Sequence, residues 1–178
     1  MTTPSNPFDA LMASLDPPMV VVTAAAGGER SGCLVGFHSQ SSIAPARSCV
    51  WLSKANRTYE VALLATHLGI HLLTETDRPL AALFGGVSGD VVDKFAAVDV
   101  DAGPDGVPVL ASCPHRLVVR KTAVLDEGGD HVCFVTQPVD AVTAGPFTPL
   151  RLSAVADLHA GHAAGDSPHW PVERPRDA

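Results

Sequence analysis

Short apolar runs separated by turn residues occur along most of the chain, and this pattern predicts strands more often than helices. Glycine pairs at Gly27-Gly28 and Gly128-Gly129 stand between consecutive runs and predict two hairpins. The runs that we expect to form strands are Met19–Thr23, Ser31–Val35, Val50–Ser53, Gly69–Leu73, Leu117–Val124, His131–Val142 and Pro149–Ser153.

Helical spacing is confined to three short segments. Phe8–Leu15 has the spacing of a short helix, and Thr58 is expected to cap a second helix that runs through Ala65. A third helix is expected to start at Asp77-Arg-Pro79, where proline in the first turn costs no hydrogen bond. The segment 85–108 is loop-rich. Long hairpins with few helical connections predict a mainly β fold with short helices, an antiparallel barrel.

The domain organisation follows from where this pattern begins and ends. Residues 1–18 carry four prolines and are expected to be an N-terminal lead-in. Residues 19–158 are expected to form one domain, because no linker or internal repeat interrupts them. Residues 159–178 are rich in histidine, proline and charge and are expected to form a loose tail.

Composition and charge narrow the classes of partner. Apolar residues make up 46% of the 178 positions, which is enough for a packed core. The formal charge of −7 argues against nucleic acid or an anionic membrane as the main partner. No apolar run is long enough to span a membrane, and the first residues do not resemble a signal peptide, so we expect a cytoplasmic protein.

Cysteine and histidine spacing gives no reason to expect a metal. The four cysteines form no C-x-x-C pair and lie among strand residues, so we expect four small buried hydrophobic side chains. The pairs His67/His71 and His159/His162 have ligand-like spacing but are expected to be ordinary histidines. The chain also lacks the usual nucleotide-binding glycine motifs and the nucleophile elbow of hydrolases.

Two polar segments stand out against the apolar runs. In Ser31–Pro45 a strand gives way to Gly, His, Ser and Gln, and small hydroxyls with free backbone N–H groups suit the polar edge of a flat ring ligand. Ser53, Lys54, Arg57 and Thr58 offer hydroxyls, an ammonium and a guanidinium just before a helix, which is a good anion site. A solvated turn with a capping Thr58 is the alternative for the second segment.

A set of segments, in this order and spacing, resembles the flavin reductase-like, FMN-binding split-barrel family, which includes the reductase partners of two-component flavin-dependent monooxygenases. The segments are Met19–Thr23, Ser31–Pro45, Leu52–Thr58, Asp93–Phe95, Gly106–Leu110 and Gly129–His131. The resemblance covers about residues 15 to 155. It implies a split barrel, bound FMN or FAD, NADH or NADPH as co-substrate, and a homodimer with the flavin near the subunit interface.

The resemblance also implies roles for individual residues. Ser41, Ser42 and Pro45 fit the family's flavin-binding segment, whereas Leu34, Gly36, Ala44 and Ala46 depart from it. Backbone contacts from Val35 and Gly36 would survive these changes, and the segment Ser53–Thr58 would hold the phosphate. Lys94, beside Phe95, matches a lysine that approaches the flavin; a surface charge beside a buried phenylalanine is the alternative. His131 matches the histidine of a G-D-H motif near the reactive face of the flavin, and a structural histidine at a strand start is the alternative.

The expected function is therefore that of an NAD(P)H:flavin oxidoreductase, which transfers hydride from nicotinamide to flavin and could supply a partner monooxygenase. No covalent nucleophile is needed for this reaction, since the cofactor carries the chemistry. Two alternatives remain at this point. One is a flavin-binding protein or electron carrier without efficient nicotinamide turnover, and the other is a split-barrel protein that uses a deazaflavin or haem.

Overall fold

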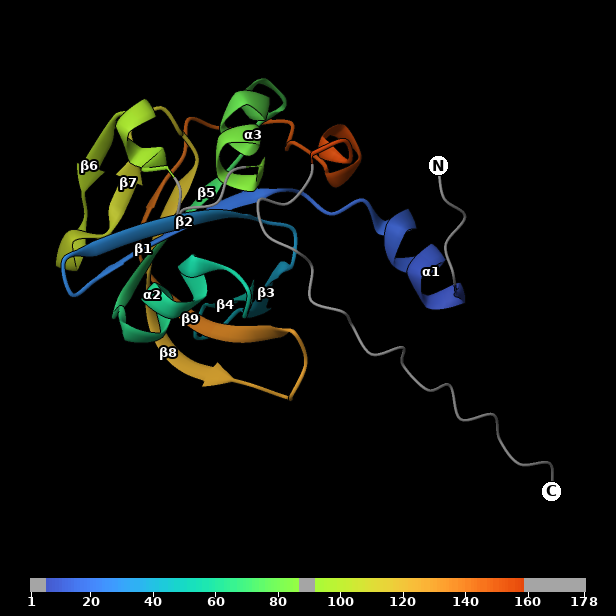
Figure 1. Ribbon diagram of the computed structural model, residues 1–178, viewed down its shortest axis with the longest axis horizontal. Coiled ribbons are helices and arrows are strands. Elements are labelled where there is room, and N and C mark those ends of the chain that lie inside the picture. The colour runs from blue at the N-terminus through green and yellow to red at the C-terminus, as the bar shows by residue number, and fades with distance from the viewer. Residues whose placement is uncertain (1–5, 87–91, 159–178) are drawn as a thin grey trace.

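The computed structural model describes residues 6–86 and 92–158, and it shows a curled antiparallel sheet flanked by short helices (Figure 1). The α-helices are α1 (Pro7–Leu15), α2 (Arg57–Leu64) and α3 (Arg78–Gly86). The strands are β1 (Val20–Ala26), β2 (Glu29–Val35), β3 (His38–Ser42), β4 (Arg47–Ser53), β5 (His67–Leu72), β6 (Val100–Ala102), β7 (Pro108–Leu110), β8 (Arg116–Leu125) and β9 (His131–Val142). Four 3-10 turns complete the fold: η1 (Glu75–Asp77), η2 (Lys94–Ala97), η3 (Pro104–Gly106) and η4 (Leu152–Val155).

The main sheet has seven strands in the order β2-β1-β5-β8-β9-β4-β3, and all of its pairs are antiparallel. β2 and β3 lie at opposite ends of this order, although only Gly36 and Phe37 separate them in the chain. The Trp51 N–H donates to the Phe37 carbonyl over 2.9 Å, so this short connection is held against β4. The sheet must therefore curl on itself, and the predicted mainly β, antiparallel split barrel is confirmed.

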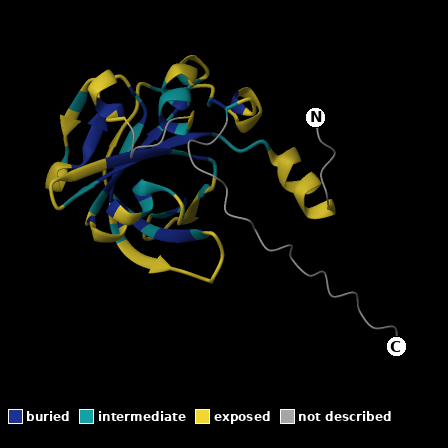
Figure 2. Cartoon of the chain, viewed as in Figure 1, coloured by how far each residue is buried: buried dark blue, intermediate teal, exposed yellow. Residues whose placement is uncertain are grey.

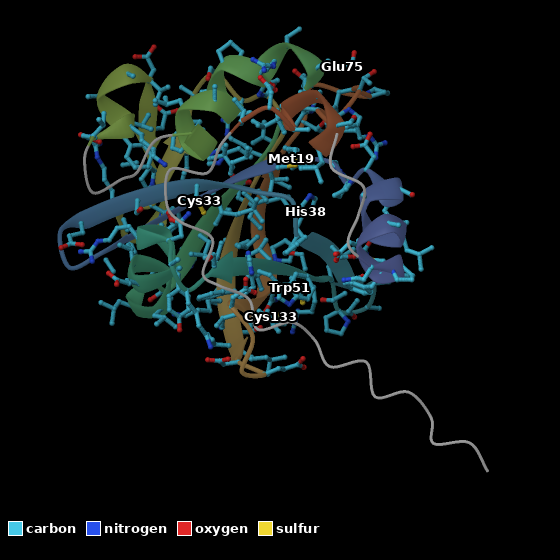
Figure 3. The ribbon with its side chains drawn as sticks, turned by 45° about the vertical axis from the view of Figure 1, so that its right-hand side comes forward. Met19, Cys33, His38, Trp51, Glu75 and Cys133 are labelled. Atoms are coloured by element: carbon cyan, nitrogen blue, oxygen red, sulfur yellow. The ribbon has the colours of Figure 1, made fainter. Side chains whose placement is uncertain are left out.

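Two hydrophobic layers share strand β1. Val20 and Val22 point into the barrel interior with Cys33, whereas Met19 and Val21 pack on the other side with the α3 helix. Met19 and Cys33, labelled in Figure 3, mark these two layers. Because both faces of β1 are buried, a shift of its register by one residue would exchange the two sets of side chains.

Helix α2 packs against the barrel core through Val61 and Ala62. The Tyr59 ring contacts Phe134 of β9 edge-on, with 6.2 Å between ring centroids. At the other end of α2, the Lys121 ammonium donates to the carbonyls of Ala62 and Leu63 over 2.8 and 2.6 Å. A cation at this position satisfies carbonyls that the helix leaves unpaired and complements its dipole.

A buried histidine joins the main sheet to the small β6–β7 sheet. The Nδ1–H of His71 donates to the Val21 carbonyl over 3.1 Å, and Nε2 accepts from the Leu110 N–H over 2.9 Å. The ring is therefore neutral, and burial lowers its pKa to about 4. Gly69, two residues earlier on β5, lies so close to Thr23 that a Cβ there would be 2.4 Å from the threonine hydroxyl. Close packing thus surrounds His71.

Helix α1 extends away from the barrel and has no buried residue (Figures 1 and 2). Asn6 caps it by accepting from the Asp9 N–H over 2.9 Å. Its base is fixed, because the Asp16 carboxylate accepts from the Ser153 N–H and hydroxyl over 2.7 and 2.8 Å. The helix is thus an anchored arm, and its apolar residues face solvent: Phe8, Leu11, Met12 and Leu15.

Most of the expected elements are confirmed. The short strands β6 and β7 were not expected, and three further corrections apply. The cap of α2 is Asn56 and not Thr58, because the Asn56 side chain accepts from the Thr58 N–H. The segment 149–153 is not a strand; it makes only isolated bridges before turning into η4. The polar segment His38–Ser42 is a strand that the apolar pattern did not predict, because it lies at the edge of the sheet with its side chains largely exposed.

The four cysteines are all free and buried, as expected. His67 contacts Asp105, and within residues 6–86 and 92–158 no three or more His, Cys, Asp or Glu side chains gather in a way that could hold a metal. In those same ranges, no helix has the length and apolarity needed to cross a membrane. His159, His162 and the expected tail lie outside the described residues.

Candidate functional site

The end of β4 and the start of β9 bring three of the expected site residues together. Ser53 lies directly opposite His131 in the antiparallel register. The Lys54 N–H donates to the carbonyl of Asp130 over 2.9 Å, which extends this pairing by one residue. Ser53, Lys54 and His131 therefore form one cluster on paired backbone.

The His131 ring is held from two sides. Its Nδ1–H donates to the Asp130 carboxylate over 2.9 Å, and its centroid is 5.1 Å from that of Phe37, with the two ring planes tilted by 60°. The hydrogen bond from His131 lowers the pKa of Asp130, so this carboxylate stays ionised and keeps the imidazole oriented. Phe37 is 58% exposed and leaves much of its aromatic surface open to a ligand.

Val35 and Gly36 lead into Phe37 from β2. The Val35 side chain points into the barrel core, opposite Val20, so only its backbone can contact a ligand. Gly36 lies beside Met19, where an added Cβ would be 3.4 Å from the sulfur. β2 ends the strand order, and one edge of its backbone is left unpaired by the main sheet. The backbone of Val35 and Gly36 is therefore the part of this segment that a ligand could contact.

Ser41 and Ser42 lie at the opposite end of the β3–β4 hairpin. Ser42 pairs with Arg47, six residues before Ser53 on β4, and this places the two serines about 20 Å from the His131 cluster at the rise of an extended strand. The structure thus does not bring these hydroxyls next to Lys54 in the same chain. It places them beside Arg47, whose guanidinium donates to the Ala46 carbonyl over 2.8 Å.

Arg57 and Thr58 begin helix α2, but their side chains differ in accessibility. The Thr58 hydroxyl is buried and is 3.0 Å from the Ser31 hydroxyl of β2, so it joins the helix to the strand. The Arg57 guanidinium is partly exposed and forms ion pairs with Glu29 of β2 and Glu60 of α2. These two carboxylates raise the pKa of Arg57. Lys54 likewise pairs with Asp126 over 2.9 Å.

Lys94 and Phe95 lie on the α3 side of β2, away from the barrel interior. Phe95 is buried as expected and contacts Phe84 edge-on, with centroids 5.6 Å apart. The alternative of a surface charge is wrong, because Lys94 is 6% exposed and its ammonium donates to the carbonyls of Gly32 and Phe84. Burial lowers its pKa. Its approach to a flavin stays a prediction that these contacts do not favour.

Sequence reasoning missed four residues of this region: Phe37, Glu29, Glu60 and Asp126. An exposed aromatic residue directly after a buried strand is a usable signal for Phe37. Glu60 lies three residues after Arg57 on a helix, and that spacing also predicts a contact. The contact between Arg57 and Glu29 spans 28 positions and depends on how β2 packs against α2, so no local pattern reveals it.

Comparison with known proteins identifies the family of this chain. The family model described as the flavin reductase like domain matches residues 12–152, which is most of the chain. This chain belongs to the flavin reductase-like family. The family resemblance stated from the sequence is therefore confirmed.

Individual relatives resemble parts of this flavin reductase-like chain. A probable flavin reductase of Rhizobium meliloti is 30% identical over 118 residues, which are 64% of this chain and 37% of that protein. The reductase subunit of stachydrine N-demethylase from the same organism is also 30% identical over 118 residues, and these cover 50% of its length. The chain thus spans between about a third and a half of these curated relatives.

A solved structure of the flavin reductase HpaC in complex with NADP+ has the same fold. The TM-score is 0.68 at 18% identity, and the match covers 80% of this chain and 91% of HpaC. At this identity the likeness supports the fold of the flavin reductase-like domain.

Proposed function

We propose that this chain is an NAD(P)H-dependent flavin reductase that binds FMN or FAD and orients a nicotinamide against the flavin ring. The observation that carries the proposal is the His131 cluster. The imidazole of His131 is oriented by Asp130 and lies beside the exposed ring of Phe37. His131 is the first residue of β9, and the pairing of β9 with β4 places Ser53 directly opposite it. Membership of the flavin reductase-like family supports the same function.

The residues of the site fit a flavin in three respects. Phe37 offers an aromatic surface to a flat ring, and the backbone around Val35 and Gly36 offers a strand edge to the ring's polar rim. Lys54 and Arg57 offer cations to a phosphate. When bound, the flavin would supply the acceptor for hydride, and the chemistry would belong to the two ligands.

The chain's own residues bind and orient in this proposal. His131 and Phe37 hold the nicotinamide against the ring, since hydride transfer requires close, aligned reactants. Asp130 keeps the imidazole in one orientation, so that the ring presents the same face to a bound nicotinamide. No side chain is asked to form a covalent bond.

The test is stopped-flow reduction of flavin by NADH and by NADPH, with His131→Ala at matched flavin occupancy. We expect the variant to reduce flavin about 10- to 100-fold more slowly, with flavin affinity nearly unchanged. This loss corresponds to an increase of roughly 1.4–2.8 kcal/mol in the activation free energy of flavin reduction. His67→Ala, which removes a histidine paired to Asp105, is the matched control and should keep the wild-type rate. An unchanged rate in His131→Ala would remove His131 from the mechanism.

We also propose that two copies form a homodimer. Arm α1 exposes 43% to 67% of Phe8, Leu11, Met12 and Leu15, and these residues recur with the spacing of one helix face. Contact with a second copy would cover this face in both protomers. Light scattering at micromolar concentration that gives the mass of a single chain would contradict this proposal.

Transfer of reduced flavin to a monooxygenase is the last part of the proposal. It is supported by the relative that is the reductase subunit of an N-demethylase. The measurement is coupled turnover of a candidate oxygenase with this chain, NADH and FMN. Oxygenase turnover that does not depend on this chain would speak against the partnership.

A further inference from the structure

The cations of the proposed phosphate site, Lys54 and Arg57, already form ion pairs with carboxylates. Arg57 contacts Glu60 through one terminal nitrogen and Glu29 through the other, so both ends of its guanidinium are engaged. Lys54 is paired with Asp126 over 2.9 Å. Two cations thus face three carboxylates, and the region as it stands is not a net positive pocket for an anion.

Packing holds the two glutamates at Arg57. Glu29 is the first residue of β2, and the hydrogen bond between Ser31 and Thr58 ties that strand to the start of α2 over 3.0 Å. Glu60 lies one helical turn after Arg57 on α2 itself. The partners therefore come from two elements whose relative position is set by buried contacts, and not from a mobile loop.

The ion pairs are nevertheless accessible enough to exchange. The exposed fractions of the side chains are 37% for Arg57, 57% for Glu29 and 58% for Glu60. Pairs at such exposed positions contribute little net free energy, because water screens them and solvates both partners when they separate. A phosphate could thus displace them, but it would bring its own negative charge close to two carboxylates.

We propose that Glu29 and Glu60 compete with the terminal phosphate of the flavin for Arg57 and so set how strongly the protein distinguishes FMN from riboflavin. The inference rests on the proposed flavin-binding function and concerns two residues that determine specificity. Competition of this kind weakens the binding of the phosphate to Arg57 and lets the flavin exchange with solution.

The experiment measures FMN and riboflavin dissociation constants by flavin fluorescence in a phosphate-free buffer of low ionic strength. The variants are Glu29→Gln, Glu60→Gln and the double variant, which keep side-chain size and remove one or both charges. Glu75→Gln is the matched control, since Glu75 is an exposed glutamate of η1 (labelled in Figure 3). Adding Arg57→Ala to the double variant removes the group for which the carboxylates compete.

We expect FMN to bind about threefold more tightly to each single variant and about tenfold more tightly to the double variant, with riboflavin unchanged. The gain should shrink at high salt and vanish when Arg57→Ala is added. The inference is overturned if wild type and variants bind flavin with the same ratio of FMN to riboflavin affinity. If no variant binds either flavin, the proposed function fails with it, and this outcome is readily told apart from an unchanged ratio.

Discussion

Stability below neutral pH should depend on one buried ring, that of His71. The ring donates to Val21 and accepts from Leu110, and this arrangement requires its neutral form. A proton on Nε2 would place two N–H groups against each other inside the core. Burial, helped by the nearby Arg116 charge, lowers the folded-state pKa from 6.5 to about 4. The perturbation is a fall in pH from 7.5 to 4.5.

The sign and size follow from linkage between protonation and folding. Between pH 6.5 and 4 the unfolded chain binds a proton that the folded chain refuses, so the free energy of unfolding falls as the pH falls. The loss from this residue alone is about 1.4 kcal/mol at pH 5.5 and about 2.6 kcal/mol at pH 4.5. It approaches a limit of roughly 3.4 kcal/mol below pH 4, and above pH 7.5 the residue contributes nothing to the pH dependence.

The assay is urea unfolding, followed by circular dichroism, at four pH values between 7.5 and 4.5. The variant His71→Gln cannot titrate in this range, so its stability should vary less with pH than that of the wild type, whatever its value at pH 7.5. Equal pH dependence in wild type and His71→Gln would refute the assignment to His71.

Three other substitutions test the packing and the site. Gly69→Ala should lower the free energy of unfolding by about 2 kcal/mol or more, measured in urea, because its Cβ would meet Thr23 at 2.4 Å; full stability would contradict that contact. Lys121→Met should cost roughly 1–2 kcal/mol in the same assay, since it leaves two carbonyls of α2 without a charged donor, and no loss would mean that water replaces it. Arg57→Ala should weaken FMN by roughly 1.5–3 kcal/mol in calorimetry while riboflavin is unaffected, and equal losses would mean that Arg57 does not contact the phosphate.

The strands with buried faces could be predicted from the sequence. Val20 to Val22 form an aliphatic run because both faces of β1 are covered, and His131 to Val142 follow a glycine turn that fixes the start of β9. Strand β3 could not be predicted in this way. Its residues Ser39, Gln40 and Ser41 are exposed at the sheet edge, where burial does not select apolar side chains.

The candidate site was predictable only where it follows the chain locally. Ser53 and Lys54 adjoin each other in sequence, but their position beside His131 depends on the pairing of β4 with β9, which the apolar pattern did not predict. The environments of Lys94 and Arg57 depend on tertiary packing. Nothing near Lys94 in sequence indicates that its ammonium is buried against the carbonyl of Phe84, and nothing near Arg57 indicates Glu29.

The passage of the chain from one end of the sheet to the other through Gly36 and Phe37 has a consequence for the order of folding. The β1–β2, β3–β4 and β8–β9 hairpins are local in sequence and can form early. The pairing of β4 with β9 joins residues as far apart as Ser48 and Thr136, which are separated by 88 positions. Since closing so long a loop costs entropy before any contact forms, this pairing should come late and limit the folding rate. Until then, the edges of preformed hairpins stay open to other chains, so refolding yield should fall as protein concentration rises.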